Sequence, residues 1–144
     1  MTILDLQRKT TVAADDKFRR DEVTIVKTEE FAVPDNHWIK VTACWRSMTS
    51  TDGPAIVKLS ITDKSDAHKQ EQLLRIDTKD TGQAGGEMSK VLKVMAQGGD
   101  ITAGRHLFKL RAVQVMGEGK IEIQAATQFP IEIGVEDLGS IPSH

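Results

Sequence analysis

The sequence predicts an all-β protein, an antiparallel, jelly-roll-like β-sandwich of about eight strands with an extended N-terminal arm. The clearest observation is a set of three C-terminal runs in which apolar and polar residues alternate, at His106–Ala112, Lys120–Ala125 and Ile131–Val135. Because successive side chains of a strand point to opposite faces, each run predicts a strand with one buried and one solvated face. The short segments between the runs contain turn-forming glycine or proline, which predicts close connections between antiparallel strands.

Length and composition fit one globular domain. The 144 residues are 39% hydrophobic and 28% charged, which is ordinary for a folded chain that builds a core without disulfide staples. The net charge of -2 gives no basis for binding nucleic acid or an anionic membrane, and no apolar run approaches the roughly 20 residues that span a bilayer. We therefore expect no nucleic acid and no membrane among the partners. A single cysteine, Cys44, favours folding in a reducing cytosol.

Residues 1–22 differ from the rest of the chain and are expected to form an arm, with the sandwich domain spanning residues 23–144. The segment carries many charges of both signs and no sustained apolar period. One interpretation is a short helix or a frayed terminus. The other is an extended arm that orders against a neighbouring subunit. In that case its apolar anchors and adjacent cations are the candidate partner-binding residues: Leu4, Leu6, Phe18, Arg19 and Arg20.

The strands of the sandwich are expected in order along the remaining chain. A turn is predicted at Phe31–Asn36, because Pro34 fixes its φ and Asp-Asn favours turn conformations, and a surface loop is predicted at Thr78–Glu87. Besides the three C-terminal runs, strands are expected at Val23–Lys27, His37–Arg46, Val57–Ile61, Gln72–Asp77 and Val91–Met95. Their inward positions predict one core, made of Ile39, Val41, Trp45, Val57, Leu59, Ile61, Phe108, Leu110, Ile121, Ile123, Ile133 and Val135.

Residue types suited to catalysis or metal binding are scattered. The histidines are His37, His68, His106 and His144. His37 and His106 both open expected strands, but a zinc site needs further ligands, such as Cys44, brought in by the fold. Asp63 and Asp66 are oxygen ligands for calcium without the dense spacing of an EF-hand. The chain has no phosphate-binding loop and no nucleophile elbow. We expect no enzymatic activity, no metal and no organic cofactor.

The C-terminal strands carry the most specific motif. Thr102–Ala112, Gly119–Ala125 and Phe129–Gly139 form three successive strands, and the last ends in Val135-Glu-Asp-Leu-Gly139. This region resembles the closing region of small β-sandwich structural proteins of tailed bacteriophages, which include capsid decoration proteins and minor tail proteins. The resemblance implies a component of the virion, assembled in the host cytoplasm. We expect a decoration protein that strengthens the head lattice as a homotrimer bound to the major capsid protein, and a minor tail or baseplate protein is the alternative.

The closing motif also has a physical rationale. Gly139 permits a backbone reversal where the sandwich ends. The adjacent carboxylates of Glu136 and Asp137 are expected to cap backbone amides or to pair with Arg105 or Arg111, which is a structural role rather than chemistry.

A carbohydrate-binding module is the second class of function, with Trp38 and Trp45 as candidate platforms for a sugar ring. Only 4% of the residues are aromatic and the chain has no tyrosine. Strand alternation places Trp45 on the inner face and leaves Trp38 alone on the outer face. We therefore favour assembly over sugar binding.

Overall fold

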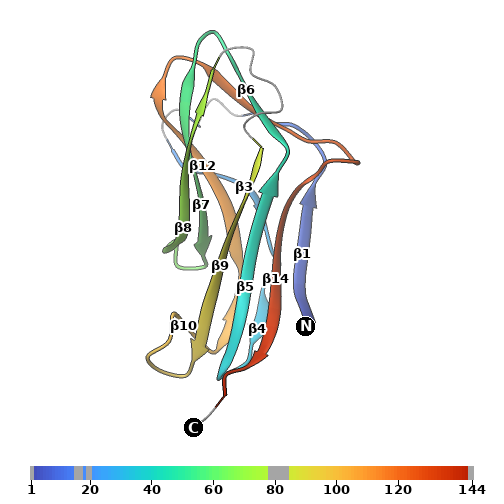
Figure 1. The fold of residues 1–144 in the computed structure, drawn as a ribbon, viewed down its shortest axis with the longest axis vertical. Coiled ribbons are helices and arrows are strands. Elements are labelled where there is room, and N and C mark those ends of the chain that lie inside the picture. Colours follow the sequence, from blue (N-terminus) through green and yellow to red (C-terminus); the bar gives the residue numbers. More distant parts are fainter. Residues whose placement is uncertain (1, 15–17, 19–20, 78–84, 143–144) are drawn as a thin grey trace.

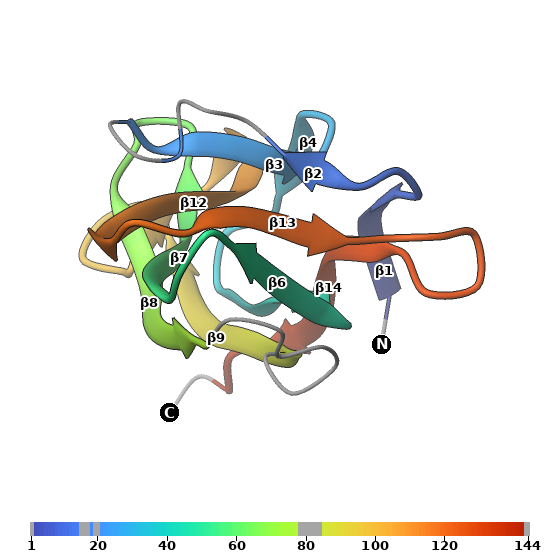
Figure 2. The same ribbon diagram turned by 90° about the horizontal axis from the view of Figure 1, so that it is seen from above.

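The structure is a computed structural model that describes residues 2–14, 18, 21–77 and 85–142. Two antiparallel sheets pack face to face (Figures 1 and 2). The first sheet contains, in spatial order, β1 (Thr2–Lys9), β14 (Ile131–Ser140), β5 (His37–Trp45), β9 (Gly86–Met95) and β10 (Ile101–Thr102). The second contains β3 (Val23–Lys27), β12 (Phe108–Gly117), β7 (Ala55–Asp63) and β8 (His68–Ile76). The predicted β-sandwich is confirmed.

The order of the eight main strands is that of a jelly roll. When β1, β3, β5, β7, β8, β9, β12 and β14 are counted along the chain, the first sheet has the order first, eighth, third and sixth. The second sheet has the order second, seventh, fourth and fifth. All pairs among these strands are antiparallel, and only the short β10 pairs in parallel, with β9. Most connections therefore cross from one sheet to the other, as two interlocked Greek keys require.

Two smaller sheets complete the molecule. β2 (Ala13–Ala14), β13 (Lys120–Gln124) and β6 (Ser47–Thr51) form a three-stranded sheet at one end of the sandwich, nearest the viewer in Figure 2. β4 (Phe31–Val33) pairs with β11 (Gly104–His106) towards the other end. The turn expected at Phe31–Asn36 is therefore shorter than predicted: the reversal lies at Asn36, which has a left-handed φ of 62°.

The N-terminal segment is not a separate arm that orders only against a neighbouring subunit, as one interpretation of the sequence expected. β1 is the first strand of the jelly roll, and its backbone pairs with β14 from Thr2 to Lys9. β2 pairs with β13. The alternation was obscured because a bulge between Ile3 and Asp5 shifts the parity of the strand. The sandwich thus begins at residue 2 rather than residue 23, and the described residues show no domain boundary at residue 22.

The core lies between the two main sheets and contains all twelve side chains predicted for it, each at most 5% exposed. Leu110 from β12, Ile133 from β14 and Ile39 from β5 are fully buried. Phe31 and Phe108 stack with their ring centroids 6.0 Å apart, which joins β4 to β12. Two strands are longer than expected, since β8 begins at His68 and β9 at Gly86.

Candidate interaction site

The predicted anchors of the N-terminal segment lie in different environments. Leu4 is partly buried against the core, and Leu6, on the outer face of β1, is 36% exposed beside Gly134. Phe18 is only 3% exposed and belongs to the core of this chain, so it is not available as an apolar anchor for a partner. Arg19 and Arg20 lie outside the described residues. The side chain of β1 most available to a partner is Ile3, which is 65% exposed.

An ion-pair network covers the outer face of the β3-β12-β7-β8 sheet. Glu22, just before β3, lies 3.3 Å from Nζ of Lys58, 3.1 Å from Nε2 of His68 and 3.6 Å from Nη1 of Arg111. Burial raises the pKa of the Glu22 carboxyl, but hydrogen bonds and charge from His68 and Lys58 outweigh it and hold this pKa below its usual value. Nδ1 of His68 also lies 3.0 Å from Glu71. The network fastens the residues before β3 to β7, β8 and β12.

Two hydroxyl-bearing residues lie beneath this network. Ser60 and Thr62 point outward from β7 yet are at most 1% exposed, and neither hydroxyl oxygen has a hydrogen-bond partner in the described part of the chain. Their register partners on β12 are Arg111 and Lys109, whose long stems can cover them. The centre of this face is therefore closed, and its accessible groups lie nearer the edges.

Exposed apolar side chains lie on two strands of the same sheet. Leu73 on β8 is 64% exposed, and Val115 and Met116 on β12 are 50% and 66% exposed. Beside Met116 lies a shallow cleft of about 330 Å³, lined by Pro54, Ala55, Ile56, Arg75, Met116 and Gly117. The sequence carries a signal for the exposed side chain on β8. In the run Leu73-Leu74, consecutive side chains of a strand cannot both face the core.

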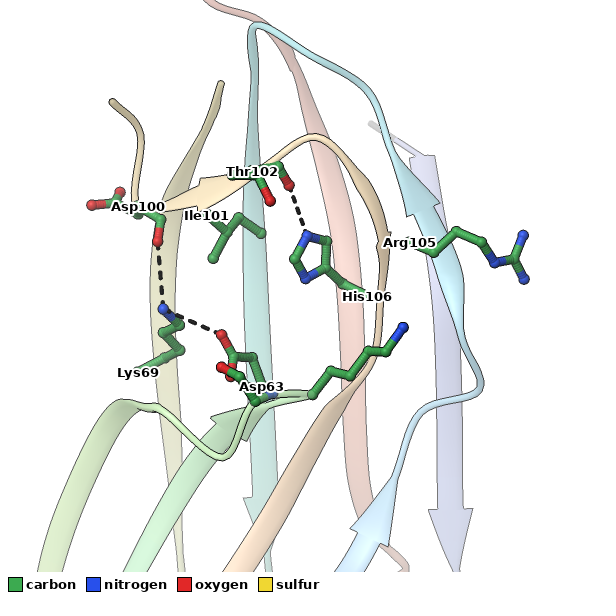
Figure 3. Close-up of a pocket in the computed structure, with 9 residues that line it drawn as sticks. Asp63, Lys69, Asp100, Ile101, Thr102, Arg105 and His106 are labelled. Atoms are coloured by element: carbon green, nitrogen blue, oxygen red, sulfur yellow. Dashed lines mark hydrogen bonds and ion pairs between the residues drawn. The ribbon is translucent and has the colours of Figure 1, made fainter. Parts of the chain in front are cut away.

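A polar cleft of about 440 Å³ lies between the β7–β8 turn and the β10–β11 region (Figure 3). Nζ of Lys69 lies 3.4 Å from the Asp63 carboxylate and 3.4 Å from the backbone carbonyl of Asp100, which links the two sheets. Nε2 of His106 hydrogen-bonds the carbonyl of Thr102 at 2.7 Å. The polar groups at the centre of this cleft bind one another, so the arrangement braces the end of the sandwich.

The two aspartates considered as calcium ligands also have partners within the protein. The Asp63 carboxylate accepts hydrogen bonds from the backbone and hydroxyl of Ser65 and from the backbone of Ala67. Asp66 lies 3.1 Å from Lys109 and 3.3 Å from Arg111. Both carboxylates therefore stabilise the β7–β8 turn and its neighbour β12.

The histidines and the cysteine have separate surroundings. His37 pairs with Asp137, His68 with Glu22 and Glu71, and His144 lies outside the described residues. Among the described residues no group of three or more His, Cys, Asp or Glu is placed to hold a metal ion.

Burial, with the charges of Glu132 and Glu87, raises the pKa of the Cys44 thiol, which makes it a weak nucleophile. Within the described part of the chain, no helix is long and apolar enough to cross a bilayer.

The aromatic side chains considered for sugar binding behave as strand parity predicted. Trp45 is 3% exposed and belongs to the core, so it cannot serve as a platform, and Trp38 is half-buried on the outer face. Phe129 is 46% exposed, with the guanidinium of Arg46 4.0 Å from its ring centroid. Two shallow depressions, of about 550 and 440 Å³, meet at Phe129.

Comparison with known proteins assigns no family. No family model matches the chain, and no curated protein matches its sequence. Among solved structures, one described as "CBM4 structure and function" matches at a TM-score of 0.39 and 8% identity, over 80% of this chain and 70% of that one. The VP2 subviral particle of infectious bursal disease virus matches at 0.35 and 12%, over 94% of this chain and 38% of that one. The Gt strain of the same virus matches at 0.30 and 11%, over 96% and 41%. At these TM-scores the similarities carry no information on function, and this chain spans less than half of either viral chain.

Proposed function

We propose that this protein is a non-catalytic structural protein of a tailed-bacteriophage virion, specifically a capsid decoration protein that stabilises the head lattice. The observation that supports this function best is the presence of an exposed aliphatic side chain on each of two edge strands. Ile3 of β1 is 65% exposed and Leu73 of β8 is 64% exposed. β1 neighbours β3 on one side of the sandwich and β8 neighbours β9 on the other, so the two edges face opposite directions (Figure 1). A small domain with two such contact edges is suited to bridging neighbours in a lattice.

The proposed mechanism is mechanical. Copies associate as homotrimers through the side of the sandwich that carries β1, and each trimer binds the major capsid protein. The added buried area raises the resistance of the particle to internal pressure without chemistry. The resemblance of Thr102–Gly139 to phage structural modules supports this assignment, because those residues form β11 to β14, including the strand that pairs with β1.

The test is the location and number of copies in purified virions. Heads and tails are separated after disruption, and the protein is quantified in each fraction by mass spectrometry. We expect it in heads at a ratio of whole numbers to the major capsid protein. Detection in tails alone would select the minor tail alternative, and absence from virions would reject the proposal.

A binding assay identifies the contact surface. Purified protein is added to particles that lack it, and an Ile3→Asp variant is expected to bind at least tenfold more weakly, which is about 1.4 kcal/mol. Lys27→Glu, a charge change on the exposed part of β3, is the matched control. Because the trimer is the form that binds the capsid, equal binding by Ile3→Asp and the wild type would show that the β1 side does not form the trimer contact.

Carbohydrate binding remains the second candidate, supported by the depressions that meet at Phe129. The Phe129 ring is half-exposed with the Arg46 guanidinium over it, and Gln128, Glu87 and Glu132 in the same depression offer hydrogen-bonding groups. Screening against host surface glycans is the test, with Phe129→Ala and Trp38→Ala as variants. Glycan binding abolished by Phe129→Ala would favour this candidate.

A further inference from the structure

β8 is an edge strand of the second sheet. Its nine residues pair with β7 on one side, and no other strand among the described residues pairs with its free side. The strand contains no proline, and its outward-facing side chains are accessible: Glu71 is 45% exposed, Leu73 64% and Arg75 76%. Such an edge presents unpaired backbone donors and acceptors to another strand.

Symmetry restricts how β8 can pair with its own copy. A two-fold axis perpendicular to the sheet keeps outward side chains on the same face in both copies. Because alternate residues of a strand point to opposite faces, an outward residue must lie opposite another outward residue. The axis therefore lies between the two copies of one residue, and not between two consecutive residues. Few registers remain, and they differ in the charges that they oppose.

Among the registers centred from Glu71 to Arg75, one is favoured by charge. Registers centred on Gln70 or Ile76 also oppose opposite charges, but they pair fewer residues of β8. With the axis at Leu73, Glu71 lies opposite Arg75 of the second copy, and the pair occurs twice by symmetry. An axis at Gln72 places Arg75 opposite Lys69, and one at Leu74 places Glu71 opposite Asp77, so both oppose like charges. An axis at Glu71 places this residue opposite Glu71 of the second copy, and an axis at Arg75 places Arg75 opposite Arg75, so both again oppose like charges. Directly opposed charges of opposite sign stabilise antiparallel pairs, and like charges destabilise them.

We propose that β8 is an interface for a second copy of this chain, paired antiparallel about Leu73. The two Leu73 side chains then contact each other at the axis, between two Glu71–Arg75 ion pairs. The proposed pairs exchange partners at an exposed surface. Arg75 lies 3.2 Å from Asp77, and Glu71 lies 3.0 Å from His68 and 4.0 Å from Lys58.

The contact identifies a second copy of this chain as the occupant of the β8 edge, one of the two contact edges named above, and it stands whether or not the protein is part of a virion. It uses the side of the sandwich away from β1, so it can join two monomers or link two larger assemblies built through the N-terminal side. In either case, loss of the β8 contact is expected to halve the mass of the assembly that this protein forms in solution.

Charge reversal tests the register. Glu71→Arg and Arg75→Glu each oppose like charges twice, and we expect each to weaken association at least tenfold by analytical ultracentrifugation. The double variant Glu71→Arg/Arg75→Glu restores opposite charges and is expected to recover the wild-type mass. Lys27→Glu is the control for the change in charge. Unchanged mass in both single variants, or failure of a folded double variant to recover, would overturn the proposal.

Cross-linking provides a second test that does not depend on charge. In a Cys44→Ser background, Leu73→Cys places two thiols opposite each other at the axis, and mild oxidation is expected to give a covalent dimer. Thr24→Cys, at an exposed position of β3 on the other edge of the same sheet, is the control and should remain monomeric on a denaturing gel. No covalent dimer with Leu73→Cys, or equal amounts with both variants, would reject the interface.

Discussion

The Asp137 carboxylate lies 2.8 Å from Nδ1 of His37, which joins the end of β14 to the start of β5. The same carboxylate accepts a hydrogen bond from the backbone N–H of Gly139 at 2.9 Å, where β14 has a bulge and Gly139 has a φ of 106°. Asp137 thus caps a backbone amide, as the closing motif predicted. The predicted arginine partners were wrong: Arg105 pairs with Glu30, and Arg111 with Glu22 and Asp66.

The Asp137–His37 contact predicts a loss of stability in acid. Burial raises the pKa of Asp137, but hydrogen bonds from His37 and Gly139 outweigh it and lower the pKa below its usual value. The carboxylate therefore stabilises the fold above about pH 4, and this contribution is lost as the pH falls through the lower folded-state pKa. Asp137→Ala should cost about 1–3 kcal/mol at neutral pH and flatten the acid limb of the stability curve. Urea denaturation across pH measures both effects, and an unchanged acid limb would contradict the assignment.

Core truncation should be costly and edge truncation should not. Leu110 is fully buried between the sheets, so Leu110→Ala is expected to lower the free energy of unfolding by about 2–5 kcal/mol. Leu73→Ala removes the same atoms from a side chain that is 64% exposed and should change stability by less than about 0.5 kcal/mol. Chemical denaturation of both variants at low protein concentration, where copies do not associate, makes the comparison.

Deletion of residues 1–10 should destabilise the domain itself. β1 pairs along its length with β14, and Leu4 packs against the core. We expect a loss of more than about 2 kcal/mol, the cost of one packed leucine, together with aggregation through the uncovered edge of β14. Thermal unfolding measures this change. A melting temperature equal to that of the full chain would restore the interpretation of a dispensable arm.

Calcium should not stabilise the protein. The oxygens of Asp63 and Asp66 are occupied by backbone amides, a hydroxyl and cationic side chains, and a calcium ion would have to displace them. A ligand that binds only the folded state raises the melting temperature. We therefore expect equal melting temperatures in excess calcium and in chelator. An increase that disappears in Asp63→Asn would show that the β7–β8 turn binds the ion.

The sequence by itself determined the class of fold and the inward face of most strands. In β12, β13 and β14 the alternation of apolar and polar residues is local information, because it follows from the two-residue period of an extended chain. Leu110, Ile123 and Ile133 therefore could be assigned to the core before any strand was paired. β1 could not be recognised in the same way, because Asp5, Gln7 and Lys9 occupy its inward register at the edge of the sheet, after a bulge.

Only the tertiary structure decided which strands are neighbours and which polar groups meet. Residues 37 and 137 are far apart in the chain and meet because β5 and β14 are adjacent. Glu22 reaches His68 because the residue before β3 lies over the outer face of the sheet, where it also meets Lys58 of β7 and Arg111 of β12. Pairing between distant strands depends on the whole set of backbone and core contacts, which no local pattern contains. For the same reason the exposed edge of β8, and its charges on either side of Leu73, became apparent only when the sheet was complete.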